Sequence, residues 1–166
     1  GNAMDTQQNL HIATIQMLPA TGDPNANVQR ATRLASQAAL EHGAELIILP
    51  ECTLSGYSGP PRNDSQRAAN RAIAEPVPGP SVDHFCRLAN ELRVYIVWGL
   101  PERAGDRFHN TAVLISPEGE LLGKYSKVHI NKHESAMGWT NGDRFSVWPC
   151  NINGVQFNLG IMICFD

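Results

Sequence analysis

The first fifty residues contain a strand–helix–strand pattern, and this pattern restricts the possible fold more than any other feature of the chain. Residues 10–17 are rich in β-branched side chains and are predicted to form a strand. Asp23 and Pro24 then supply a helix N-cap and a first helical residue, and Gly43 stands where a C-cap belongs. Residues 46–49 are a short apolar run typical of a buried strand. Two strands joined by a helix are normally parallel, so the sequence predicts an α/β fold.

Further helices and a further strand are predicted along the chain. Residues 64–75 are expected to form a helix, and the next helix is expected to be capped by Ser81 and to carry one apolar face. Residues 94–100 are again a short apolar run, which indicates another buried strand. The stretch 53–63 is rich in Gly, Pro and Ser and is expected to be a loop close to Glu51.

The second half of the chain has the pattern of hairpins. Two hairpins are predicted, over residues 111–125 and over residues 145–163. The second contains Asn-Gly at 153–154, which is strongly favoured in two-residue hairpin turns. The polar stretch 126–144 between the hairpins is not predicted to be helical. Because hairpins add antiparallel strands, the expected class is α/β with a mixed sheet.

The composition is that of an ordinary globular chain of one domain. Of 166 residues, 42% are hydrophobic and 17% are charged, and the formal net charge is -3. There is no run of Lys or Arg, so no nucleic-acid partner is expected. No apolar stretch approaches the ~20 residues of a membrane helix, so no membrane partner is expected.

The N-terminus and the cysteines indicate the compartment. Residues 1–3 (Gly-Asn-Ala) precede Met4 and are interpreted as a cloning scar, so the domain is expected to begin at Met4 and to cover residues 4–166. The polar residues that follow are unlike a signal peptide, which predicts a cytoplasmic protein. The cysteines lie far apart with no C-x-x-C pair, and in a reducing compartment they are expected to be free thiols. They are Cys52, Cys86, Cys150 and Cys164.

Three residues are candidates for catalysis. Cys164 ends a short apolar run and can serve as a nucleophile, although a free cysteine is more often a small buried hydrophobe. A nucleophilic thiol needs a base and a group that stabilises developing negative charge. Glu51, directly after a predicted strand, can be the base, and Lys127 can favour the thiolate and bind an oxyanion. For a single Glu or Lys, a solvated surface position is also common.

Taken together, the three residues lie in three ordered motifs. These are Leu-Pro-Glu at 49–51, Lys-Tyr-Ser-Lys at 124–127 and Gly-Ile-Met-Ile-Cys at 160–164. The ordered set resembles the nitrilase superfamily of carbon–nitrogen hydrolases. Smaller features also match: Gln16, Gly56-Tyr57, Asn110-Thr-Ala112 and Gly142-Asp143.

The resemblance implies a role for each of these residues. Cys164 would attack a carbonyl or nitrile carbon, and Glu51 would accept the thiol proton, protonate the leaving amine and later activate water. Lys127 and the backbone N–H of Phe165 would hold the oxyanion. Glu134 would be the second glutamate of the family, which orients the lysine and the substrate, although a solvated loop charge is an equally common state of a glutamate.

The resemblance also suggests what lines the pocket and what is absent from it. Tyr57 and Trp139 are expected to contact the substrate, with core or surface positions as the alternatives. His129 and His133 have a spacing that can hold a metal on a helix, but no third ligand is evident, so no metal site is expected. No cofactor is expected either.

The residues after the nucleophile suggest the subclass. True nitrilases typically have Trp-Glu there, whereas this chain has Phe165 and Asp166, which resembles the amidase and carbamoylase branches. The expected reaction is therefore hydrolysis of a small non-peptide amide with release of ammonia or an amine. Hydrolysis of an N-carbamoyl compound is the alternative within the family.

The family fold is an αββα sandwich of mixed sheets with helices outside, and its catalytic domain continues beyond the nucleophile. The chain is therefore expected to be the N-terminal portion of such a domain, either one piece of a cut protein or a truncated product, with a homo-oligomer expected for the full-length form. A shortened, inactive relative that acts as a partner subunit is the third explanation. It makes a non-catalytic interaction module the alternative to an enzyme.

Overall fold

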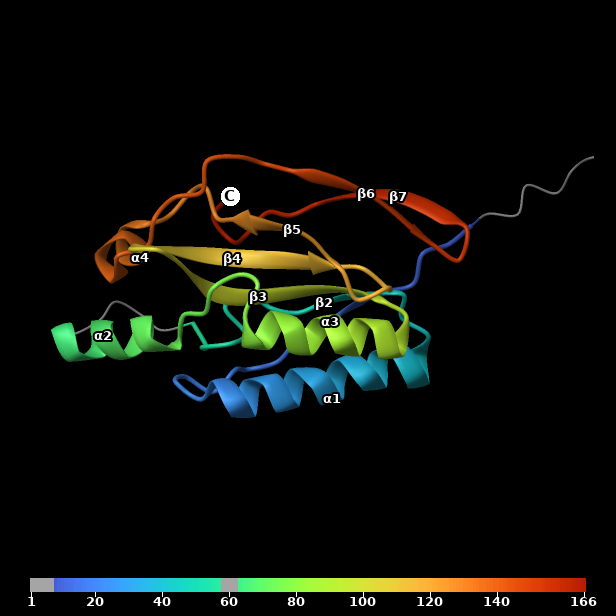
Figure 1. The fold of residues 1–166 in the computed structure, drawn as a ribbon, viewed down its shortest axis with the longest axis horizontal. Helices are drawn as coiled ribbons and strands as arrows, with labels where there is room; N and C mark the ends of the chain where they lie inside the picture. Colours follow the sequence, from blue (N-terminus) through green and yellow to red (C-terminus); the bar gives the residue numbers. More distant parts are fainter. Residues whose placement is uncertain (1–7, 58–62) are drawn as a thin grey trace, which may run out of the picture.

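The structure is a computed structural model that describes residues 8–57 and 63–166. Its main body has three layers (Figure 1). Helices α1 (Pro24–His42) and α3 (Pro80–Leu92) cover one face of a central sheet, and a hairpin of β6 (Val147–Ile152) and β7 (Val155–Gly160) covers the other. The predicted cloning scar and part of the predicted loop after Tyr57, residues 58–62, lie outside the described residues.

The central sheet has five strands in sequence order. They are β1 (Ile12–Thr14), β2 (Leu46–Ile48), β3 (Tyr95–Ala104), β4 (Arg107–Ile115) and β5 (Leu121–Ser126). The first three are parallel to one another, whereas β4 pairs antiparallel with both β3 and β5. The predicted α/β class with a mixed sheet is confirmed. However, β1 is shorter than residues 10–17, and β3 runs past residue 100 to form a long hairpin with β4.

The end signals of α1 are confirmed residue by residue. The carboxylate of Asp23 accepts a hydrogen bond from the Ala26 N–H at 3.0 Å, and Pro24 is the first helical residue. The helix ends at Gly43 in the left-handed conformation, with φ +67°, which glycine adopts without strain. The face toward the sheet carries Ala31 and Ala35, both fully buried, so the helix can lie close to the strands.

The predicted cap of α3 was wrong. Gly79 is the N-cap and Pro80 opens the helix, because proline fits the first helical position, where no N–H partner is needed. Ser81 lies one residue further in. Its hydroxyl donates to Glu75 at 2.6 Å and accepts from the indole N–H of Trp98 at 3.0 Å. Ser81 thus accepts the hydrogen bond of a buried tryptophan in the core and does not cap the start of the helix.

Two further helices lie near the ends of the strands. Helix α2 (Asp64–Ile73) agrees with the predicted helix over 64–75, except that it ends two residues earlier. Helix α4 (Lys132–Met137) lies in the stretch 126–144, where no helix was expected. It forms because Asn131 and Glu134 make a reciprocal capping box at its start.

The second predicted hairpin is confirmed, but its last strand ends early. Asn153 and Gly154 both have positive φ, +50° and +80°, as a two-residue hairpin turn of this kind requires. Strand β7 ends at Gly160, so the predicted continuation to residue 163 was wrong. Cys164 therefore lies in a turn and not at a strand end, and it is exposed. Within the described residues, no helix is long and apolar enough to cross a membrane.

Candidate active site

Glu51 lies just beyond the carboxyl end of β2, in a tight turn packed on β3. The turn is held by a hydrogen bond from the Leu54 N–H to the Gly99 carbonyl at 3.2 Å. A side chain at Gly99 would collide with the Pro50 carbonyl and would come within 3.1 Å of the Cys52 nitrogen, so only glycine permits this close approach. The Glu51 side chain is 24% exposed, which leaves it accessible to a small molecule.

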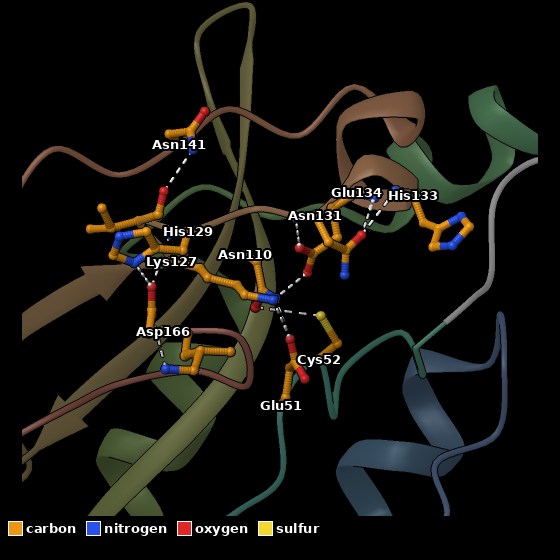
Figure 2. Close-up of polar contacts among 12 residues, drawn as sticks. Glu51, Cys52, Asn110, Lys127, His129, Asn131, His133, Glu134, Asn141 and Asp166 are labelled. Carbon is orange, nitrogen blue, oxygen red and sulfur yellow. Dashed lines mark hydrogen bonds and ion pairs between the residues drawn. The ribbon is translucent and has the colours of Figure 1, made fainter.

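Lys127 follows β5 and carries the central charge of the site. Its ammonium lies 2.7 Å from Glu134 Oε1 and 3.7 Å from Glu51 Oε1, and its side chain is fully buried (Figure 2). Burial acts to lower the pKa of Lys127, but the hydrogen bond to Glu134 and the charges of both carboxylates outweigh it and raise the pKa. The residue is therefore a permanent cation near neutral pH.

Glu134 uses its two carboxylate oxygens for two tasks. Oε1 accepts from Lys127, and Oε2 accepts from the Asn131 N–H at 2.8 Å. In return, the Asn131 side chain accepts from the Glu134 N–H at 2.9 Å, which completes the cap of α4. Glu134 is 1% exposed, so the solvated loop position considered from the sequence was wrong.

Asn110 links Glu51, Lys127 and a neighbouring thiol. Its Nδ2 donates to Glu51 Oε1 at 2.6 Å, and its Oδ1 lies 3.6 Å from the Cys52 sulfur, which donates to it. Its backbone carbonyl accepts from the Lys127 N–H at 2.8 Å. Burial, reinforced by the charges of Glu51 and Glu134, raises the pKa of the Cys52 thiol, which therefore remains a protonated donor. Cys52 is thus a packed thiol, as predicted.

Asn110 had been noted in the sequence only as a supporting feature. The signal that could have identified it is its residue type: it is an amide at the start of a buried stretch of β4 and is itself 1% exposed. Buried amides need hydrogen-bond partners, so such a residue must face other polar groups.

Replacing Asn110 with alanine is expected to lower kcat about tenfold or more for any reaction that uses Glu51, because Glu51 loses a charge-assisted hydrogen bond. The measurement is steady-state kinetics, with a thermal melt to verify that the variant is folded. Asn158→Ala on the exposed side of β7 is the matched control and should behave as wild type. Wild-type kcat in folded Asn110→Ala would show that the contact does not hold the base.

Cys164 and Glu51 line the same cavity. The cavity has a volume of about 210 Å³. Its other walls are mostly apolar residues from the end of β2 and the turn after it, the first half of β3, the middle of β4 and the segment before the cysteine. Charge on Cys164 also contributes to the raised pKa of Lys127, so the sulfur lies within electrostatic range of the ammonium. The structure therefore brings the three predicted catalytic residues together from distant segments.

The remaining predicted site residues fall into three places. Among the described residues, none accepts a hydrogen bond from the backbone N–H of Phe165. Tyr57 and Trp139 line one small cavity of about 30 Å³ beside Cys52, separate from the cavity that contains Cys164. His129 binds Asp166, and within residues 8–57 and 63–166 no group of three or more ligand side chains could hold a metal.

Comparisons with known proteins agree with this geometry. The family model described as carbon-nitrogen hydrolase matches residues 11–166. The chain is 33% identical over 156 residues to a nitrilase of Pyrococcus abyssi, covering 93% of this chain and 55% of that protein. It is 29% identical over 167 residues to the omega-amidase NIT3 of Saccharomyces cerevisiae, covering 96% of this chain and 56% of that protein.

Solved structures share the fold. The Saccharomyces cerevisiae Nit3 structure, described as a member of branch 10 of the nitrilase superfamily, matches with a TM-score of 0.76 and 27% identity over 94% of this chain and 55% of that one. The chain spans about half the length of the curated relatives it matches. The family model covers nearly the whole chain, and the chain therefore belongs to the carbon–nitrogen hydrolases of the nitrilase superfamily.

Proposed function

We propose that the protein containing these residues hydrolyses a small non-peptide amide through a thioester on Cys164. The observation that carries this proposal is the fully buried Lys127 ammonium, held by Glu134 and lying 3.7 Å from Glu51. A buried cation near a carboxylate and a thiol is suited to acyl transfer, because it can stabilise the negative charge that develops on the substrate oxygen. The name of the yeast relative, an omega-amidase, supports an amide substrate.

In the first half of the reaction, the Cys164 sulfur attacks the amide carbon and Glu51 takes the thiol proton. The electron pair of the carbonyl moves to oxygen, and the resulting anion is stabilised by Lys127 and by the backbone N–H of Phe165. The carbon–nitrogen bond then breaks, and Glu51 returns its proton to the leaving amine or ammonia. The product of this half is a thioester on Cys164.

In the second half, Glu51 takes a proton from water as the water attacks the thioester. The tetrahedral anion again lies against Lys127, and its collapse breaks the carbon–sulfur bond, releases a carboxylic acid and leaves the Cys164 thiolate, which takes back the proton held by Glu51. Glu134 keeps Lys127 charged and fixed in both halves, because one of its oxygens stays bound to the ammonium. The raised pKa of Lys127 means that it acts as a cation and not as a proton donor.

The proposed substrate is an amide small enough for the Cys164 cavity, whose walls are mostly apolar. Tyr57 and Trp139 are proposed to contact the substrate from the separate small cavity beside Cys52. The alternative substrate, an N-carbamoyl amine, would use the same residues and would release carbon dioxide as well as ammonia. We further propose a cytoplasmic homo-oligomer. Large apolar side chains are exposed on the second half of the chain and leave apolar surface for contacts with another copy. They include Phe145, Val147, Met162 and Phe165.

The test uses the complete natural protein that contains these residues. Short aliphatic amides, ω-amides and carbamoyl amines are screened for ammonia and carbon dioxide release. Acid-quenched samples are then digested, and mass spectrometry should find the acyl group on the peptide that contains Cys164. Cys164→Ala should abolish both product and adduct, whereas Cys86→Ala, a change on the half-buried face of α3, should retain both.

Two outcomes would contradict the proposal. Ammonia release by Cys164→Ala at the wild-type rate would exclude this thiol as the nucleophile. No release from any amide, together with iodoacetamide labelling of Cys164 no faster than that of Cys86, would favour the non-catalytic interaction module.

A further inference from the structure

One buried carboxylate joins the turn that carries Cys164 to the segment that carries Lys127. It belongs to Asp166, whose side chain is fully buried and lies beside His129 (Figure 2). Its Oδ1 accepts from the His129 N–H at 2.8 Å and lies 3.0 Å from the His129 ring Nδ1. Its Oδ2 accepts from the Ile163 N–H at 3.0 Å and from the hydroxyl of Tyr125.

We propose that Asp166 is a positioning residue that sets the Cys164 thiol against the Lys127 ammonium. The proposal rests on the proposed function, in which these two groups act on the same carbonyl. Asp166 itself touches neither the substrate nor the reacting atoms. It acts through the backbone and side-chain groups of the two segments to which it binds.

At one end, Asp166 closes the turn around Cys164. Its backbone N–H donates to the Ile163 carbonyl at 3.0 Å, and its carboxylate accepts from the N–H of the same residue. Cys164 lies inside this turn with φ +45°, a left-handed conformation that residues other than glycine adopt at some energetic cost. Such a conformation persists only when the surrounding contacts hold it, and Asp166 supplies two of those contacts.

At the other end, Asp166 binds residues on both sides of Lys127. Tyr125 lies two residues before the lysine and His129 two residues after it. The Tyr125 hydroxyl also accepts from the Val128 N–H at 3.2 Å, which connects the two sides. Lys127 is therefore bracketed by groups that share one carboxylate, and a shift of the Cys164 turn would be transmitted directly to this segment.

The carboxylate must be ionised to hold all four groups. Burial acts to raise the pKa of Asp166, but the hydrogen bonds from Tyr125, His129 and Ile163 outweigh it and keep the pKa below its usual range. Burial of Tyr125 and its hydrogen bond to Asp166 raise the pKa of Tyr125 to about 12, so the phenol remains a donor. An asparagine at position 166 has only one acceptor oxygen and cannot replace both.

The decisive variant is Asp166→Asn in the complete natural protein, with Asp143→Asn as the matched control. The Asp143→Asn substitution removes the same charge from a side chain that is 78% exposed. We expect kcat of Asp166→Asn to fall about 10- to 100-fold with KM within about twofold of wild type, because small misplacements of reacting groups cost rate and not binding. Asp143→Asn should match wild type.

A second measurement requires no substrate. Iodoacetamide alkylation of Cys164, followed by peptide mass spectrometry, is compared with alkylation of Cys86 in the same sample. In Asp166→Asn the ratio of the two rates should fall severalfold, because the turn that is proposed to set Cys164 against Lys127 loses its hydrogen bond to the carboxylate. Tyr125→Phe removes one of the four donors and should lower the same ratio by a smaller factor. If Asp166→Asn does not fold, Tyr125→Phe is the variant that tests the proposal.

The outcomes separate the positioning role from the proposed function. If Cys164→Ala is inactive but folded Asp166→Asn and Tyr125→Phe keep wild-type kcat and alkylation ratios, the positioning role is overturned and the proposed function stands. A lower melting temperature with unchanged kcat at temperatures below the melt also overturns it, because the role would then be structural. Activity in Cys164→Ala would instead overturn the proposed function.

Discussion

Glu51→Gln is expected to lower kcat/KM for amide hydrolysis by about 10²- to 10⁴-fold, the usual contribution of a general acid–base residue. Glutamine has nearly the same shape and can still accept the hydrogen bond from Asn110, so the turn after β2 should be retained. What is lost is the ability to accept the proton of Cys164 and to return it to the leaving amine. Because the same carboxylate also activates water, both halves of the reaction should be slowed.

The measurement is the rate of ammonia release, with alkylation of Cys164 as a second readout. Iodoacetamide labelling should also slow in Glu51→Gln, since the thiol has lost its base. Glu118→Gln, in the exposed turn between β4 and β5, makes the same change away from the site and should behave as wild type. A Glu51→Gln protein with more than about a tenth of wild-type kcat/KM would exclude general base catalysis by this residue.

Lys127→Met is expected to abolish activity and also to destabilise the fold by about 3–5 kcal/mol, the usual result of removing one partner of a buried ion pair. Methionine fills much of the space of the lysine stem but leaves Glu134 buried without a counter-charge. Glu51, which is partly exposed, is affected less. Stability is measured by denaturant unfolding, and activity by ammonia release at a temperature where the variant is folded.

The double variant Lys127→Met with Glu134→Gln separates the two effects. Neutralising Glu134 removes the uncompensated buried charge, so part of the lost stability should return, while the oxyanion site remains absent and activity remains lost. Recovery of activity together with stability would show that Lys127 is only structural. Wild-type stability in the single variant would show that the pair is not buried in solution.

The sequence contains strong local signals for much of the fold. Asp23, Pro24 and Gly43 fix the ends of α1 because caps act through hydrogen bonds within a few residues. Asn153 and Gly154 fix the β6–β7 turn for the same local reason. Ser81 misled the prediction, because a serine near a helix start can cap it or can serve a distant partner, and here Trp98 recruits it. That choice is made by tertiary packing.

The site shows the same division between local and distant effects. Glu51, Lys127 and Cys164 could be selected by order and residue type. The contacts of Asn110 and Asp166 that hold these residues could not be predicted from the sequence, because they join residues 59 and 37 positions apart. Helix α4 was overlooked because it is six residues long, and its capping box depends on a glutamate that also binds a buried lysine. Such a short helix is marginal without these tertiary contacts.

The two oxygens of the Glu134 carboxylate bind different groups, and this has a thermodynamic consequence. One oxygen closes the first turn of α4 and the other holds Lys127, while Met137 at the far end of α4 and Trp139 just beyond it line the small cavity with Tyr57. A ligand that fills this cavity and an anion that binds Lys127 therefore act on the same short helix. If the binding of either one shifts this helix, the two binding free energies are coupled through it. The coupling is then reciprocal, so that each ligand changes the affinity for the other by the same factor.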